Sequence, residues 1–195
     1  MIEEKNFYFI TDKYFVDFPD KGLMKNHEMI NGKSHNRPCF LAIKDKKFDD
    51  IYWMIPISSK VDKYTNIFNH KMKKFKSCDT IHFGLVLGEK RAFLLQNMCP
   101  VIERYIEQQY FVSNKAVTID KNLEKSLIEK SQRVLSLNNK LRIIFPDVKK
   151  IKHKLINQLK QEKEYQKNRS SNKKVYYKQK LNFSNDNHNK HELTR

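Results

Sequence analysis

The stretch IYWMIPISSK, residues 51–60, decides the fold, because an apolar strand ends there in two hydroxyls and a lysine. Apolar side chains stand at every second position from Ile51 to Ile57, which predicts a strand with one side in a core. Ser58, Ser59 and Lys60 are therefore expected at the rim of a rigid element. Such a rim is suited to holding a phosphodiester.

The charge of the chain favours the same kind of ligand. Its 195 residues carry 39 Lys and Arg against 22 Asp and Glu, a net charge of +17. Such an excess of positive charge is typical of proteins that bind nucleic acids. Residues 149–195 hold 14 basic and 4 acidic residues and few large apolar ones. We expect one domain over residues 1–150 and a basic tail over 151–195, helical at its start and then disordered.

Several classes of protein are disfavoured. The three cysteines, Cys39, Cys78 and Cys99, are far apart, and the seven histidines lack metal-ligand spacing. We therefore expect no disulfide framework, no metal site and no cofactor. The sequence also has no apolar run of about 18 residues and no leader at its start, so a cytoplasmic protein without a membrane span is expected.

Short strands followed by a helix predict an α+β fold, a small β-barrel with added helices. Asp120 is expected to cap the helix, whose apolar positions recur at helical spacing from Leu123 to Leu135. Lys25 to Pro38 is predicted to be a long polar loop, and residues 69–76 are either a short helix or a loop. Strands are expected over residues 6–10, 39–43, 51–57, 80–87 and 91–97.

Cleavage of RNA without a metal uses the 2′-hydroxyl as nucleophile and needs a base, a cation and a proton donor. Ser58 and Ser59 can orient the phosphate or the hydroxyl. Lys60 or Lys63 can supply the cation, Arg37 is suited to a phosphate fork, and His82 can transfer protons. The alternatives are a solvated turn at the serines and a structural histidine in a strand.

Further basic and aromatic residues are candidates for binding RNA. The clusters around residues 33–37 and 71–76 offer phosphate contacts, although a solvated helix face gives the same pattern. Tyr64 can stack on a base, although core packing is the usual role of such a ring. The set comprises Lys33, His35, Lys63, Tyr64, Lys71, Lys73 and Lys74.

Four segments in order resemble the ToxN/AbiQ family, including its CptN-like branch, of type III toxin–antitoxin endoribonucleases. They span much of residues 6–148, and the third matches the family's Pro-Leu-Thr/Ser-Ser-x-Lys motif. They are Phe7 to Tyr14, Asn36 to Ile43, Pro56 to Lys60, and Ala92 to Ile102.

The resemblance implies an SH3-like barrel similar to the MazF and PemK toxins. It also implies metal-independent cleavage of mRNA that leaves 2′,3′-cyclic phosphate and 5′-hydroxyl ends. The expected partner is a repeated pseudoknot RNA antitoxin, which the toxin cuts from its own precursor and with which it forms a closed ring. No protein antitoxin is expected, and the implied role is phage defence by abortive infection.

The family's hydroxyl pair falls on Ser58 and Ser59, and its lysine falls near Lys60. The family commonly has one residue between the second hydroxyl and the lysine, whereas Lys60 follows Ser59 directly here, so Lys63 is the alternative. The family's tyrosine and lysine ahead of the first core strand have no clean counterpart, and Arg37, His35 or Lys33 is expected to substitute.

Two other functions share these features. A type II MazF-like toxin would have a similar barrel but would need a protein antitoxin. A non-enzymatic nucleic-acid-binding regulator would show the same charge without cleaving RNA.

Overall fold

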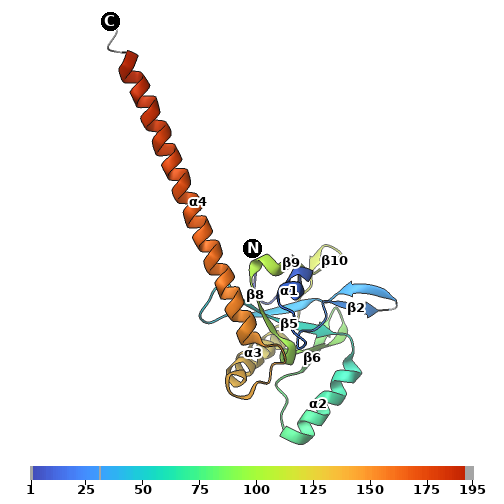
Figure 1. Cartoon of the computed structure of the whole chain (residues 1–195). Helices are drawn as coiled ribbons and strands as arrows, with labels where there is room; N and C mark the ends of the chain where they lie inside the picture. Colours follow the sequence, from blue (N-terminus) through green and yellow to red (C-terminus); the bar gives the residue numbers. More distant parts are fainter. Residues whose placement is uncertain (1, 31, 192–195) are drawn as a thin grey trace. The chain divides into compact units, whose positions relative to one another are not determined.

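A computed structural model describes residues 2–30 and 32–191 and confirms the predicted α+β class (Figure 1). The main sheet is antiparallel, with the strand order β6-β7-β5-β4-β1-β9 and with β8 also paired to β5. These strands are β1 (Phe7–Ile10), β4 (Cys39–Lys44), β5 (Tyr52–Ser58), β6 (His82–Val86), β7 (Glu89–Phe93), β8 (Cys99–Val101) and β9 (Ile106–Gln109).

The centre of the sheet is β5, the strand predicted from the alternation of residues 51–57. One edge of β5 pairs with β4, and the other edge is shared by two strands. Tyr52 to Met54 pair with β8, whereas Ile57 and Ser58 pair with β7. The two ends of the strand order, β6 and β9, are not paired with each other. The described strands therefore form an open sheet, and the expected closed barrel is wrong.

Two short hairpins lie beside the main sheet. One consists of β10 (Phe111–Val112) and β11 (Lys115–Ala116). The other, β2 (His27–Ile30) with β3 (Lys33–Asn36), occupies the segment that was expected to be a loop. Every residue of β3 is exposed, so no alternation of buried apolar side chains marks this strand in the sequence.

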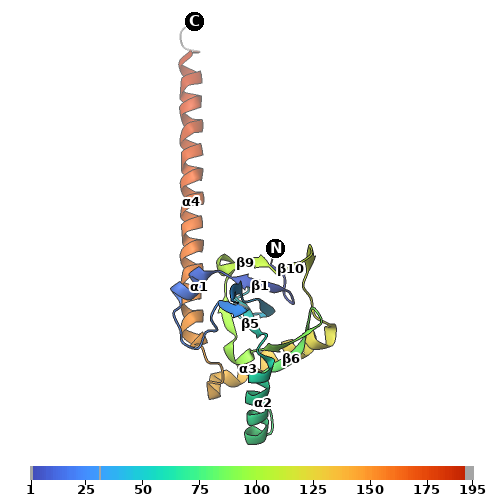
Figure 2. The same ribbon diagram turned by 90° about the vertical axis from the view of Figure 1, so that its right-hand side faces the viewer.

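Four helices complete the described chain: α1 (Asp12–Asp17), α2 (Val61–Phe75), α3 (Lys121–Leu141) and α4 (Val148–His191). Asp120 caps α3 as predicted, since its carboxylate accepts hydrogen bonds from the backbone of Asn122 at 2.9 Å and of Leu123 at 3.0 Å. Helix α2 begins directly after the two serines and leads away from the sheet (Figure 2). The expected strand over residues 91–97 ends at Phe93 and is followed by a 3-10 turn, Leu95–Asn97.

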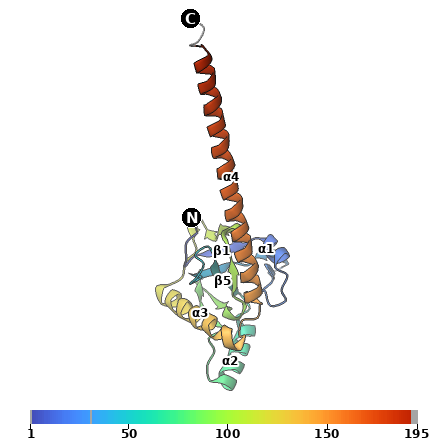
Figure 3. The ribbon, with the colours of Figure 1, turned by 60° about the vertical axis from the view of Figure 1, so that its left-hand side comes forward.

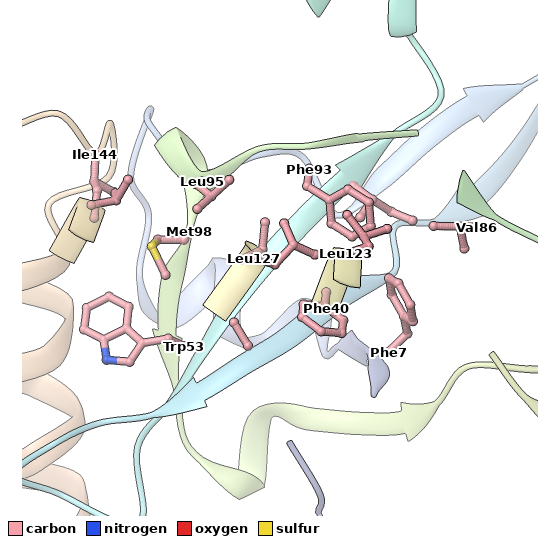
Figure 4. Packing of buried hydrophobic residues seen from close by; sticks show 14 of the residues in the cluster. Phe7, Phe40, Trp53, Val86, Phe93, Leu95, Met98, Leu123, Leu127 and Ile144 are labelled. Carbon is pink, nitrogen blue, oxygen red and sulfur yellow. The ribbon is translucent and has the colours of Figure 1, made fainter. Parts of the chain in front are cut away.

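The core lies between the sheet and α3, which crosses one side of the strands (Figure 3). Phe40 packs edge-on against Phe93 at 6.2 Å between ring centroids, and Leu123 and Leu127 of α3 join these rings (Figure 4). The helix also touches Gly84 of β6, where a Cβ atom would lie 2.2 Å from Leu123 Cδ2. Helix and sheet thus meet too closely for any side chain at Gly84.

The chain divides into two compact units, and the boundary along the sequence lies between Leu155 and Ile156, within α4. The predicted division near residue 150, with disorder in the later tail, stays a prediction. Within the described residues, none of the helices combines the length and the apolar character needed to cross a membrane.

Candidate active-site groove

A groove of about 270 Å³ opens where β5 ends. Three separate parts of the fold bring polar side chains to it: Ser59 from the end of β5, His35 from β3, and Arg91 from β7. Phe9 and Tyr110 line it as well, with their rings edge-on at 5.4 Å. The groove therefore combines a hydroxyl, an imidazole, a guanidinium and aromatic surface.

The two serines have different positions. Ser58 is 2% exposed, and its Oγ accepts a hydrogen bond from the backbone N–H of Lys60 at 3.2 Å. Ser59 is exposed, and its carbonyl accepts the N–H of Val61 at 2.8 Å, which turns the chain into α2. Ser58 thus stabilises the turn, whereas Ser59 is an exposed residue that lines the groove.

Arg37 is buried in the wall of the groove. Its Nε donates to the carbonyl of Lys25 at 3.0 Å, and a terminal nitrogen donates to the carbonyl of Ile57 at 2.7 Å. These bonds connect the segment before β2, the end of β3 and the end of β5. The Arg37 guanidinium, which was predicted to bind phosphate, therefore holds together the backbone segments that carry His35 and Ser59.

Arg91 was missed in the sequence. In the register of β6 and β7 it lies opposite Gly84. Because Arg91 and the buried Phe93 are two residues apart, their side chains lie on the same side of β7. It is half-buried and forms an ion pair with Glu89. The signal that could have found it is an arginine at a core-facing position of a predicted strand.

His82 does not line the groove. It lies at the start of β6, whereas the groove contacts Val86 at the other end, about 13 Å away at the usual rise of a strand. The contact of Gly84 with Leu123 lies between the two positions. Burial, and then the nearby charge of Lys130, lower the pKa of His82. The structure thus separates His82 from Ser59.

Neither Lys60 nor Lys63 lines the groove. Both are exposed at the start of α2, directly after Ser59, and the ammonium of Lys63 lies 5.7 Å from the centre of the Tyr64 ring. The N-terminus of a helix adds partial positive charge at the same place. Position alone therefore leaves the choice between the two lysines open.

Two of the predicted RNA-binding residues make contacts within the protein. Tyr64 is 6% exposed, with its hydroxyl 3.9 Å from Met24 Sδ, so its ring packs in the core. Lys71 donates to Thr80 Oγ1 and to Gln96 Oε1, each at 2.7 Å, and burial lowers its pKa. Their binding of RNA stays a prediction.

The remaining predicted RNA-binding residues are exposed. Lys33 and His35 lie on β3, and only His35 of these two lines the groove. Lys73 and Lys74 lie in the last turn of α2, about 18 Å along the helix from its start. They can contact only RNA that extends well beyond the groove.

The arrangement suits acid–base chemistry on a phosphodiester. Arg91 can bind the phosphate, Ser59 can orient it, and the imidazole of His35 can transfer a proton. Within residues 2–30 and 32–191, no group of three His, Cys, Asp or Glu side chains is placed to hold a metal ion.

No family model and no curated protein matches the sequence. Among solved structures, the fold is similar to that of AbiQ, a lactococcal anti-phage endoribonuclease belonging to the type III toxin–antitoxin system. The TM-score is 0.60, and the match covers 81% of this chain and 99% of the AbiQ chain at 15% sequence identity. The expected likeness to AbiQ is thereby confirmed, whereas the SH3-like barrel is not.

Proposed function

We propose that this chain is a metal-independent endoribonuclease, the toxin of a type III toxin–antitoxin system. The observation that carries the proposal is the meeting of Ser59, His35 and Arg91 in one groove. The AbiQ-like fold supports it, since AbiQ is an anti-phage endoribonuclease belonging to the type III toxin–antitoxin system.

In the proposed reaction, the ribose 2′-hydroxyl attacks the adjacent phosphorus while a base removes its proton. His35 is the base, and Ser59 orients the phosphate. Arg91, together with Lys60 or Lys63, stabilises the negative charge of the phosphorane. The P–O5′ bond breaks and the 5′-oxygen takes a proton from water, while His35 later releases the proton of the 2′-hydroxyl to solvent. The products are a 2′,3′-cyclic phosphate and a 5′-hydroxyl.

This assignment revises the catalytic set predicted from the sequence. His35 replaces His82 because it lines the groove, and Arg91 replaces Arg37 because the Arg37 guanidinium binds backbone carbonyls. Ser58 supports the turn that positions Ser59.

We further propose the partners that the family resemblance implies. Messenger RNA is the substrate, and a repeated pseudoknot RNA is the antitoxin, which the toxin cuts from its own precursor and binds in a closed ring. The protein acts in the cytoplasm, in phage defence by abortive infection. A relation of the open sheet to the SH3-like fold of MazF and PemK toxins belongs to the same proposal.

The test is cleavage of RNA in EDTA by the purified protein, together with growth arrest on expression. Ser59→Ala should abolish both but leave binding of the antitoxin RNA unchanged. Ser77→Ala is the matched control, because Ser77 is exposed and outside the groove. Full cleavage by the Ser59→Ala variant would discard the site.

The same experiments separate the alternatives. Absence of cleavage and of growth arrest would favour a nucleic-acid-binding regulator. Rescue of growth by a short neighbouring reading frame, rather than by tandem RNA repeats, would favour a type II toxin with a protein antitoxin.

A further inference from the structure

A second and larger pocket, of about 400 Å³, lies at the other end of the β4–β5 hairpin. Its apolar wall includes Trp53 and Leu135, and its polar wall includes Gln132, Ser136 and Asn138. The carbonyl of the Asn138 side chain accepts the N–H of Ile144 at 2.8 Å, so this buried amide is held in place. A cavity of this size, with a few fixed polar groups, suits one small ligand or one group of a larger ligand.

The pocket is strongly basic. Five lysines line it, namely Lys44, Lys46, Lys47, Lys149 and Lys152, against the single carboxylate of Asp45. Four of the five are exposed, and Lys152 is partly buried. A ligand with negative charge at the rim is therefore favoured.

The one carboxylate is already neutralised by the protein. Asp45 accepts hydrogen bonds from Lys152 Nζ at 2.5 Å and from Trp53 Nε1 at 3.0 Å, and its other oxygen accepts the N–H of Lys47 at 3.0 Å. Burial opposes ionisation of Asp45, but these bonds outweigh it, and its pKa lies below the usual value. Within the part of the chain that the structure describes, the other four lysines form no ion pair, although the Glu4 carboxylate accepts the backbone N–H of Lys44.

The pocket is separate from the groove. On β5 the pocket contacts Trp53 and the groove contacts Ile57, about 13 Å apart along the strand. On β4, the distance from Pro38 at the groove to Lys44 at the pocket is about 20 Å.

We propose that this pocket binds one nucleotide of an RNA strand, with the phosphate on the lysine rim and the base against the amides and the apolar wall. Bases of single-stranded RNA are recognised in this way, by hydrogen bonds to their edges and by contact with their faces. The choice of RNA rests on the proposed function. The pocket would hold RNA at a distance from the scissile bond, so it contributes to affinity and not to the chemical step.

Trp53 provides a direct readout, because it is the only tryptophan of the chain and it lines the pocket. The probe is a 2′-O-methyl dodecanucleotide, which cannot be cleaved by 2′-hydroxyl attack. It should change the Trp53 fluorescence saturably. Ser136→Phe, which fills the pocket from an exposed position of α3 without changing charge, should weaken binding at least tenfold.

The rim is tested by the double variant Lys46→Gln/Lys47→Gln. It should weaken binding about tenfold and lower the slope of log K against log salt by about 1.4, as expected for two lost phosphate contacts on a single strand. Lys13→Gln/Lys21→Gln removes the same charge from exposed sites outside the pocket and should leave affinity within about twofold.

Cleavage of a dinucleotide, whose single phosphodiester cannot extend from the groove to the pocket, keeps this proposal separate from the proposed function. All these variants should cut it at the wild-type rate. Unchanged affinity for the dodecanucleotide in Ser136→Phe would overturn the pocket as a nucleotide site. Tighter binding of adenosine monophosphate than of the dodecanucleotide would overturn an RNA strand as the occupant.

Discussion

Replacement of Arg37 tests whether this residue holds the groove together or takes part in the chemistry. Arg37→Met keeps the length of the side chain but removes the donors to the carbonyls of Ile57 and Lys25. A hydrogen bond from a charged group contributes about 1.5–3 kcal/mol, and the Lys25 bond is partly solvated, so we expect a loss of about 3 kcal/mol in the free energy of unfolding.

The assay is urea unfolding followed by the fluorescence of Trp53. At a slope of about 2 kcal/mol per molar urea, the midpoint should fall by about 1.5 M. Arg37→Lys should recover at most half of that loss, because an ammonium group lacks the planar fork that reaches both carbonyls. Ser59→Ala should leave the midpoint within about 0.3 M, since the exposed Ser59 hydroxyl supports no core contact.

Cleavage, measured where all variants are folded, completes the test. Arg37→Met should retain more activity than Ser59→Ala, because Arg37 acts through the position of its neighbours. The reasoning is refuted if Arg37→Met unfolds at the wild-type urea concentration but loses cleavage as completely as Ser59→Ala. That result would indicate that the Arg37 guanidinium binds the scissile phosphate.

Three further predictions concern other parts of the fold. The folded-state pKa of His82 lies below its ordinary value of about 6.5, so the unfolded chain binds more protons and stability should fall as the pH drops through and below 6.5. His82→Gln should flatten this pH dependence of the urea midpoint while cleavage persists, and an unchanged slope would contradict the assignment. Gly84→Ala should cost about 1–3 kcal/mol in urea unfolding through its clash with Leu123, and wild-type stability would show that α3 does not press on this strand. Gly22→Ala should cost more than Gly84→Ala in the same assay, because its Cβ would lie 2.3 Å from the backbone carbon of Phe145 rather than against a side chain; the reverse order would contradict the packing.

The sequence predicted the elements that have a buried side. The apolar alternation before Ser58 marked β5, and the Asp120 cap followed by periodic leucines marked α3. The hairpin that carries His35 was missed, because a fully exposed strand leaves no such pattern. Closure into a barrel was wrong, because β6 and β9 at the two ends of the described sheet do not pair, and such a long-range pairing leaves no local pattern in the sequence.

The candidate site was predicted only in part. Ser59 follows a recognisable strand, so its place at the rim could be inferred from the chain. The roles of Arg91 and His82 depend on which end of β6 and β7 faces the groove, and only the register gives that. Arg37 was assigned by residue type, whereas its burial against two carbonyls decides its role.

The most direct test of the central claim is the mass of the ends produced when the wild-type protein cuts RNA in EDTA. The account predicts a 2′,3′-cyclic phosphate on one fragment and a 5′-hydroxyl on the other, and no cleavage of the same strand with deoxyribose at the scissile position. Fragments with 3′-hydroxyl and 5′-phosphate ends, or a strict requirement for a divalent ion, would contradict it.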